Sequence, residues 1–248
     1  MSRRRFFAPP EAFKHQTVTL AGDEARHLRE VLRLKIGAEV FVFDGAGREF
    51  RCSVASSRRD EALLDHCKEI VPTHSESPLR LTLAVALLKG EKFDLVVQKA
   101  TELGVAQILP VMTHNADIRL RDSTDAEKRV NRWRRIAVEA AKQCGRARVP
   151  TVSLPVSFET LTINQEDSLR IMFSERDGTS LDESLNTAAR PESALALIGS
   201  EGGWTSEEIA TARSSGWLIV TIGGRILRAE TAAIAATVLL QNKWGDVQ

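Results

Sequence analysis

The first part of the chain alternates between apolar and polar residues over short runs, the pattern of half-buried β-strands. Such runs lie at residues 17–20, 38–43 and 48–55. A Gly-Ala-Gly sequence predicts a hairpin turn between the last two runs. Apolar residues at helical spacing predict one helix that is N-capped by Asp23 and ends before Gly37. We therefore expect a small β-barrel over residues 1–72.

The pattern changes after residues 73–78, whose Pro and Ser content is typical of a linker. Apolar runs predict strands at 79–88, 106–112, 169–173, 194–199 and 217–223. Helical periodicity predicts helices at 91–103, 124–144, after 205, and 229–243. Thr124 with Glu127, and Thr205 with Glu208, have the spacing of capping boxes. Alternating strands and helices predict a mostly parallel α/β sheet over residues 79–248.

Composition excludes several classes of protein and names no partner. The 248 residues carry a net charge of only +1, so any nucleic-acid surface must come from local clustering of basic residues. No apolar run reaches the roughly 18 residues of a membrane helix, so we expect a cytoplasmic protein. Cys52, Cys67 and Cys144 are too scattered for a disulfide framework, and we expect a reducing compartment.

Familiar cofactor and catalytic motifs are missing from the sequence. It contains no G-x-G-x-x-G after a strand, no P-loop, no G-x-S-x-G and no C-x-x-C. The spacing of His66, Cys67 and His74 fits no zinc template, so we expect no metal site.

Two glycine-rich loops carry the chemistry: IGSEGGWT at 198–205 and IGGRILRAETAA at 222–233. Each follows an apolar strand and precedes a helix, and ligands of open α/β sheets bind at this edge. The glycines let backbone groups reach a flat ligand such as adenine. Arg225 and Arg228 lie beside a helix N-terminus, where cations are unfavourable, so they need an anionic ligand or a carboxylate such as Glu230.

These loops resemble the signature loops of the ribosomal RNA small subunit methyltransferase E family, in the SPOUT superfamily. Further similar blocks are EARHLREVLRLKIG (24–37), EKFDLVVQKATELGVAQILPV (91–111) and RWRRIAVEAAKQCGRARVP (132–150). The resemblance thus covers nearly the whole chain. Ser200 departs from it, because the family usually has proline there.

The resemblance implies a trefoil-knotted α/β methyltransferase domain behind an N-terminal PUA-like RNA-binding β-barrel. It implies a homodimer that uses S-adenosylmethionine to methylate N3 of a uridine in 16S rRNA, within the small ribosomal subunit near the decoding region. Carried over to this sequence, the cofactor-binding residues are Phe173, Ser174, Ile198, Gly199, Glu201, Gly202, Gly203, Ile222, Gly223, Gly224, Ile226, Leu227, Arg228, Thr231 and Ala232.

The reaction needs deprotonation at uridine N3, because the protonated nitrogen is a poor nucleophile. We expect Arg228 or Arg225 to stabilise the developing uridinate, and Glu230 or Glu201 to accept the proton or orient an arginine. Phosphates are expected to bind clustered basic residues. These RNA-binding residues are Arg3, Arg4, Arg5, Arg26, Arg29, Arg33, Lys35, Arg146 and Arg148.

Two alternatives stay open at this level. A SPOUT methyltransferase of this kind could act on tRNA or on a ribose 2′-hydroxyl, which would need no N3 deprotonation. A non-catalytic rRNA-binding assembly factor would have no need for a cofactor cradle, so intact loops argue against it.

Overall fold

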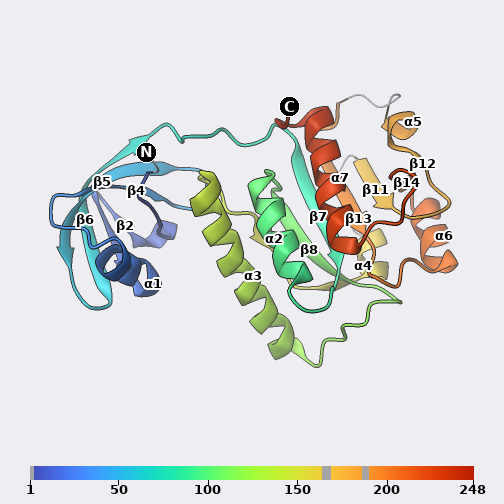
Figure 1. Cartoon of the computed structure of the whole chain (residues 1–248), viewed down its shortest axis with the longest axis horizontal. Helices are drawn as coiled ribbons and strands as arrows, with labels where there is room; N and C mark the ends of the chain where they lie inside the picture. The colour runs from blue at the N-terminus through green and yellow to red at the C-terminus, as the bar shows by residue number, and fades with distance from the viewer. Residues whose placement is uncertain (1–2, 164–168, 186–189) are drawn as a thin grey trace. The chain divides into compact units, whose positions relative to one another are not determined.

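The computed structural model describes residues 3–163, 169–185 and 190–248, and the chain forms two compact units (Figure 1). Unit 1 comprises Met1–Glu76 and Val138–Val149, and unit 2 comprises Ser77–Ala137 and Pro150–Gln248. Unit 1 therefore includes a segment that sequence patterning assigned to the second domain. That segment is the end of helix α3 (Ser123–Cys144) and the residues that follow it.

Unit 1 contains a six-stranded sheet with the strand order β1-β4-β5-β6-β3-β2. The strands are β1 (Arg5–Phe7), β2 (Phe13–Lys14), β3 (Thr17–Ala21), β4 (Glu39–Phe43), β5 (Glu49–Ser57) and β6 (Glu61–Ile70). A 3-10 helix η1 (Pro10–Ala12), helix α1 (Gly22–Arg26) and the π-helical turn η2 (His27–Val31) complete it. Among the described strands of unit 1, only β1 and β4 pair in parallel, and the expected hairpin joins β4 to β5.

Alternate strand positions supply the apolar core of unit 1. Val40 and Val42 of β4, with Leu64 of β6, are fully buried, and Leu28 packs on them from η2. The helix begins at Gly22 and no side chain caps it, so the prediction of Asp23 as N-cap was wrong. Gly22 has φ +57°, which lets the chain turn directly from β3 into the helix.

Two cysteines of unit 1 lie opposite each other on neighbouring strands. Cys52 of β5 and Cys67 of β6 form a disulfide, and Cys144 is a free thiol. The prediction that the cysteines are too scattered for disulfides was therefore wrong for this pair. Sequence spacing could not reveal it, because the pairing depends on β6, a strand the pattern did not predict.

Unit 2 contains an eight-stranded sheet in which every pairing is parallel, as predicted. Its order is β10-β8-β7-β13-β11-β14-β12, and β9 pairs with β8. The strands are β7 (Arg80–Ala86), β8 (Gln107–Met112), β9 (Thr151–Val152), β10 (Val156–Ser157), β11 (Leu169–Phe173), β12 (Thr179–Ser180), β13 (Ser193–Ile198) and β14 (Leu218–Thr221).

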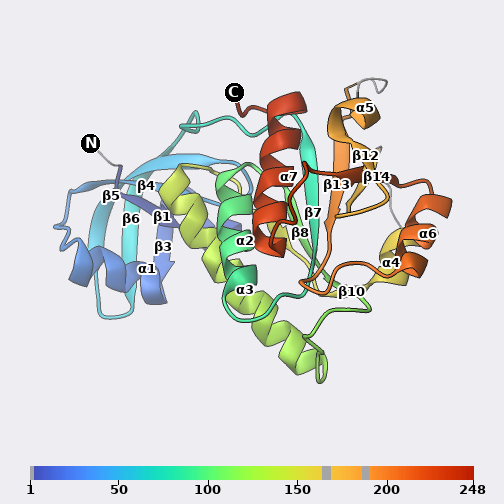
Figure 2. The same ribbon diagram turned by 45° about the vertical axis from the view of Figure 1, so that its right-hand side comes forward.

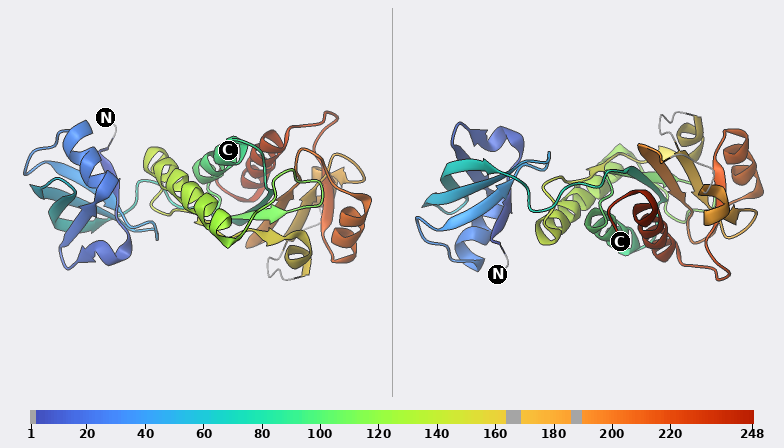
Figure 3. Two further views of the ribbon diagram at one scale, coloured as in Figure 1. Left: turned by 90° about the horizontal axis from the view of Figure 1, so that it is seen from below. Right: turned by 90° about the horizontal axis from the view of Figure 1, so that it is seen from above.

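Helices cover both faces of this sheet. They are α2 (Lys92–Glu102), α4 (Phe158–Ile163), α5 (Leu181–Leu185), α6 (Ser206–Ser214) and α7 (Ala229–Trp244), together with the first part of α3. Leu195 and Leu197 of β13 pack in one cluster with α4 and α6. Ala194 and Ala196 point the other way, toward α7, which lies beside α2 (Figures 2 and 3).

The helix starts test the two predicted capping boxes. Thr205 and Glu208 form the box at α6, with both reciprocal hydrogen bonds present. At α3 the prediction was wrong, because the helix begins at Ser123 and the Asp122 carboxylate accepts the Asp125 N–H at 2.8 Å.

Within the described ranges, no helix combines the length and the apolar character that a membrane crossing requires.

Candidate functional site

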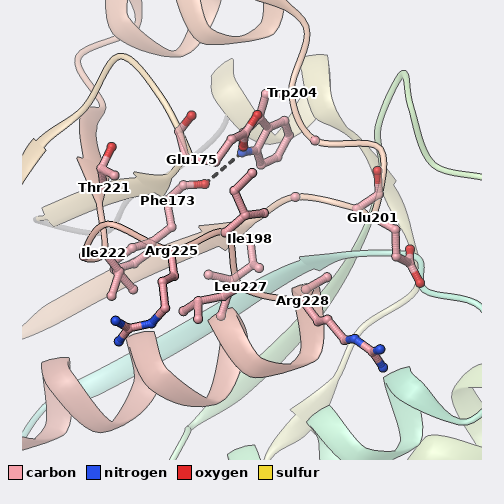
Figure 4. A pocket seen from close by; sticks show the side chains of 18 of the residues that line it. Phe173, Glu175, Ile198, Glu201, Trp204, Thr221, Ile222, Arg225, Leu227 and Arg228 are labelled. Carbon is pink, nitrogen blue, oxygen red and sulfur yellow. Dashed lines mark hydrogen bonds between the residues drawn. The ribbon is translucent and has the colours of Figure 1, made fainter.

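A cleft of about 540 Å³ lies at the carboxyl edge of the unit 2 sheet (Figure 4). It forms where three neighbouring strands, β13, β11 and β14, end side by side. Residues 173–175, 198–204 and 221–229 supply its walls. Ligands of parallel sheets bind at this edge, and the volume falls within the range of small-molecule sites.

The loop after β14 leaves open space beside its glycines. A Cβ atom at Gly223 or Gly224 would meet no atom within 4 Å. Gly223 also has φ +63°, a conformation that side chains disfavour. Ile198, Ile222 and Leu227 add apolar surface to the cleft. The combination of apolar walls with open backbone suits a flat, partly apolar ligand such as a nucleoside.

The glycines after β13 have a second role that the sequence did not reveal. A Cβ at Gly199 would lie 3.0 Å from the Trp204 ring, and one at Gly202 would lie 2.8 Å from Asn115. At Gly203, which has φ +66°, the Cβ would lie 2.9 Å from Glu175 Oε1. These glycines therefore let the loop pack closely against its surroundings as well as line the cleft.

Trp204 ties this loop to the neighbouring strand. Its indole N–H donates to the Phe173 carbonyl oxygen at 2.8 Å, and the residue is 2% exposed (Figure 4). Arg176 in turn donates to the Trp204 carbonyl at 2.7 Å. Sequence reasoning missed Trp204, although its place directly after the two glycines signalled a packing role.

The predicted cofactor residues come together at this cleft. All of them line it except Thr231, which is exposed on the first turn of α7. The lining also contains Glu175, Ser200, Trp204, Thr221, Arg225 and Ala229, of which only Arg225 was predicted to act at the site.

Two exposed arginines border the cleft. Arg225 and Arg228 both belong to its lining, and their guanidinium groups point in different directions (Figure 4). Arg228 also occupies the N-cap position of α7. The N-terminus of α7 carries a partial positive charge, so it disfavours a nearby guanidinium and favours an anion. An anionic group bound here would be stabilised by the arginines and by the helix N-terminus.

The two candidate carboxylates have different surroundings. Glu201 lines the cleft, and its Oε1 atom accepts from the Lys92 ammonium at 2.8 Å. Partial burial opposes ionisation, but Lys92 and backbone N–H groups outweigh it and lower the pKa of Glu201. Glu230 does not line the cleft, and its Oε2 atom is buried without a hydrogen-bond partner among the described residues.

Two of the predicted RNA-binding arginines are structural in unit 1. The Arg5 side chain is 7% exposed, pairs with buried Glu49 at 2.9 Å and donates to the Ala141 carbonyl at 2.9 Å. The Arg146 side chain is also 7% exposed and pairs with Glu76. Neither guanidinium is free for a phosphate, so the prediction was wrong for this pair.

The remaining predicted basic residues lie nearer the surface of unit 1. Arg29 is half-buried, and the others are exposed: Arg3, Arg4, Arg26, Arg33, Lys35 and Arg148. Arg26 pairs with Asp23 at 3.3 Å, and Arg29 pairs with Glu30. Val31 and Ile36, which are 69% and 75% exposed, lie among these cations.

The part of the chain that the structure describes holds no group of three or more His, Cys, Asp or Glu side chains that could bind a metal ion.

Comparisons with known proteins agree over nearly the whole chain. Residues 75–241 match the model of an RNA methyltransferase domain, and residues 20–65 match that of an RNA methyltransferase PUA domain. The ribosomal RNA small subunit methyltransferase E of Synechocystis is 33% identical over 94% of this chain and 75% of its own length.

Two solved structures give the same result. The ribosomal RNA small subunit methyltransferase E of Neisseria gonorrhoeae, bound to S-adenosylmethionine, aligns with a TM-score of 0.87 at 32% identity. A protein from Legionella pneumophila, solved with S-adenosylmethionine as its bound cofactor, aligns with a TM-score of 0.91 at 30% identity. Each alignment covers 99% of this chain and 100% of the other. The chain belongs to the ribosomal RNA small subunit methyltransferase E family.

Proposed function

We propose that this protein transfers a methyl group from S-adenosylmethionine to N3 of a uridine in 16S rRNA, near the decoding region of the small subunit. The observation that carries the proposal is the cleft between the 198–204 and 221–229 segments, at the edge where parallel sheets bind ligands. The relatives solved with S-adenosylmethionine support this choice of cofactor.

The residues of the cleft fit S-adenosylmethionine. Open space beside Gly223 and Gly224 admits the planar adenine, and Ile198, Ile222 and Leu227 provide an apolar lining for it. Backbone N–H and C=O groups of the two loops would bind its polar edge. When bound, the cofactor supplies a methyl group that is already activated as a sulfonium.

The arginines at the mouth of the cleft prepare the acceptor base. Removing the N3 proton of uridine leaves negative charge on the base, and a nearby guanidinium stabilises that charge. Arg228 and Arg225 both line the cleft and are exposed to an incoming nucleotide. We assign the charge-stabilising role to Arg228 first, because the N-terminus of α7 adds to its positive field.

Glu201 and Glu230 divide the remaining roles. The Lys92 ion pair lowers the pKa of Glu201, which makes its carboxylate a weaker base and suits it to positioning. Glu230 keeps the role of proton acceptor in this proposal, since one carboxylate oxygen lacks a hydrogen-bond partner among the described residues. Accepting a proton requires its side chain to turn toward the substrate.

Unit 1 binds the RNA in this proposal. Exposed Arg26, Arg33 and Lys35, with half-buried Arg29, neutralise phosphates, whereas Arg5 keeps its structural role. The base must leave its stack for N3 to be reached.

A second copy of the chain completes each site in a homodimer, and the methyltransferase domain carries the trefoil knot that the family resemblance implies.

Methyl transfer from labelled S-adenosylmethionine tests the substrate class. Purified protein should label small ribosomal subunits that lack the modification and leave tRNA unlabelled. Arg228→Ala should lower kcat by a larger factor than it weakens S-adenosylhomocysteine binding, because the arginine lines the cofactor cleft and also acts on the RNA base. Wild-type turnover in Arg228→Ala would contradict its role, and labelled tRNA would contradict the substrate class.

A further inference from the structure

The segment that follows β8, residues 113–119, contacts the cleft loop that follows β13, residues 198–204. Strand order β8-β7-β13 brings the ends of these strands to one edge of the sheet. The Asn115 side-chain NH₂ donates to the carbonyl oxygens of Gly202 and Gly203, at 3.2 and 3.3 Å. Both acceptors are carbonyl oxygens, so the amide must present its nitrogen to them.

The same segment approaches the loop backbone closely. A Cβ at Gly202 would lie 2.8 Å from both the Cβ and the carbonyl oxygen of Asn115, so only glycine fits there. Next to it, the His114 N–H donates to Glu208 Oε1 at 2.9 Å. Glu208 is 7% exposed, and its other oxygen accepts the Thr205 N–H at 2.9 Å. Hydrogen bonds therefore hold the loop at Gly202 and Gly203 and again at Thr205, through Glu208.

The segment is itself braced. Arg119 donates to the carbonyl oxygens of Thr113 and His114, at 3.4 and 2.9 Å. Asp117 pairs with Lys89 at 2.8 Å, and Lys92 pairs with Glu201 of the loop at 2.8 Å. These hydrogen bonds and ion pairs hold the 113–119 segment in place beside the loop.

We propose that Asn115 is a positioning residue that holds the Gly202–Gly203 peptides in the shape that binds S-adenosylmethionine. This inference rests on the proposed function, because it assumes that the cleft is the cofactor site. Asn115 does not line the cleft, so it acts through the loop. When the loop leaves its binding shape for part of the time, apparent affinity falls in proportion to the population lost.

Two substitutions separate positioning from packing. Asn115→Ala removes both hydrogen bonds and should weaken S-adenosylhomocysteine binding by about threefold to tenfold. Asn115→Asp has the same shape, but it places a charged oxygen against two carbonyl oxygens. It should therefore bind more weakly than Asn115→Ala, whereas a packing role predicts the opposite order.

Calorimetry with S-adenosylhomocysteine, together with thermal unfolding, makes the measurement. Exposed Asn131 on α3 offers a matched control, because Asn131→Asp makes the same chemical change away from the loop. That control should bind like wild type. In turnover, KM for S-adenosylmethionine should rise in the Asn115 variants, while kcat at saturation and KM for RNA stay within about twofold of wild type.

The outcomes distinguish this inference from the proposed function. Failure of the wild-type protein to bind either cofactor form would refute the proposed function. Normal wild-type binding, with Asn115→Asp binding as well as wild type, would refute the positioning role alone. If Asn115→Asp does not fold, Asn115→Leu replaces it, because leucine has a similar size and no donor. Wild-type affinity in Asn115→Leu would refute the positioning role in the same way.

Discussion

Replacing Gly224 with alanine separates cofactor binding from protein stability. Gly224 lines the cleft, its φ lies outside the left-handed region, and a Cβ there would meet no atom within 4 Å. The folded protein therefore accommodates the added methyl group without strain or clash. The methyl group instead occupies space that we assign to S-adenosylmethionine.

Gly224→Ala should change the free energy of unfolding and the cofactor affinity in opposite directions. Alanine reduces the freedom of the unfolded chain, so the free energy of unfolding should rise by about 0.4–1 kcal/mol. The midpoint of thermal unfolding should then rise by about 1–4 °C. An added methyl in a packed site costs about 1–3 kcal/mol, so cofactor affinity should fall by about fivefold to 150-fold.

Calorimetry with S-adenosylhomocysteine and thermal unfolding give the two readouts. Gly37→Ala is the matched control, because a Cβ there also meets no atom within 4 Å but Gly37 has φ +81°. Alanine is strained in this left-handed conformation, so Gly37→Ala should lower the free energy of unfolding by about 1–2 kcal/mol. The cofactor affinity of this control should stay unchanged. Wild-type affinity in Gly224→Ala would refute the reasoning, because the 222–228 loop would then not contact the cofactor.

Three further changes test other parts of the structure. Trp204→Phe removes the hydrogen bond to the Phe173 carbonyl and should lower the free energy of unfolding by about 1–3 kcal/mol, measured by urea denaturation. Burial raises the pKa of the Glu24 carboxyl above its ordinary value of 4.5. The protonated Glu24 carboxyl therefore contributes to the free energy of unfolding below pH 4.5, and this contribution is lost as pH rises through the raised pKa. Glu24→Gln should flatten this decline when the free energy of unfolding is measured against pH. Changing exposed Arg33 or half-buried Arg29 to Gln should reduce the slope of log affinity for RNA against log salt by about one each.

Each of these tests has a result that contradicts it. Unchanged unfolding of Trp204→Phe would mean that the indole hydrogen bond contributes nothing to stability. An equal pH dependence in Glu24→Gln and wild type would assign the decline to another group. For RNA, Lys128→Gln on α3 is the control, because it removes an exposed positive charge outside the proposed surface. A slope that falls equally in this control would contradict the assignment to Arg29 and Arg33.

Apolar patterning predicted the longer elements of unit 2 well, because buried parallel strands are nearly continuous apolar runs. Ser193–Ile198 is buried at every position, and its bounds differ from the prediction by one residue at each end. Strand β6, Glu61–Ile70, was missed because half of its residues are polar, and exposed Leu63 lies between buried Ala62 and Leu64, so apolar and polar residues do not alternate there. Its pairing with β5 also contains register shifts, which interrupt simple alternation.

The two cofactor loops could be found from sequence because glycines directly after strands mark the ligand-binding edge. Their supports could not be found in this way. Trp204 acts through a bond to Phe173, and Asn115 acts through bonds to Gly202 and Gly203, so each depends on contacts distant in sequence. Arg5 shows the converse, since a basic run predicted RNA contact and the fold uses its guanidinium in an ion pair with Glu49.

Identification of the modified nucleoside distinguishes N3 methylation of uridine from every other RNA methylation. Purified protein is incubated with S-adenosylmethionine and unmethylated small ribosomal subunits, with tRNA in parallel, and the digested RNA is analysed by nucleoside mass spectrometry. We expect new 3-methyluridine in 16S rRNA and none in tRNA. A methylated ribose, or methylation confined to tRNA, would contradict the proposed reaction, and no methylation of any RNA would favour a non-catalytic RNA-binding factor.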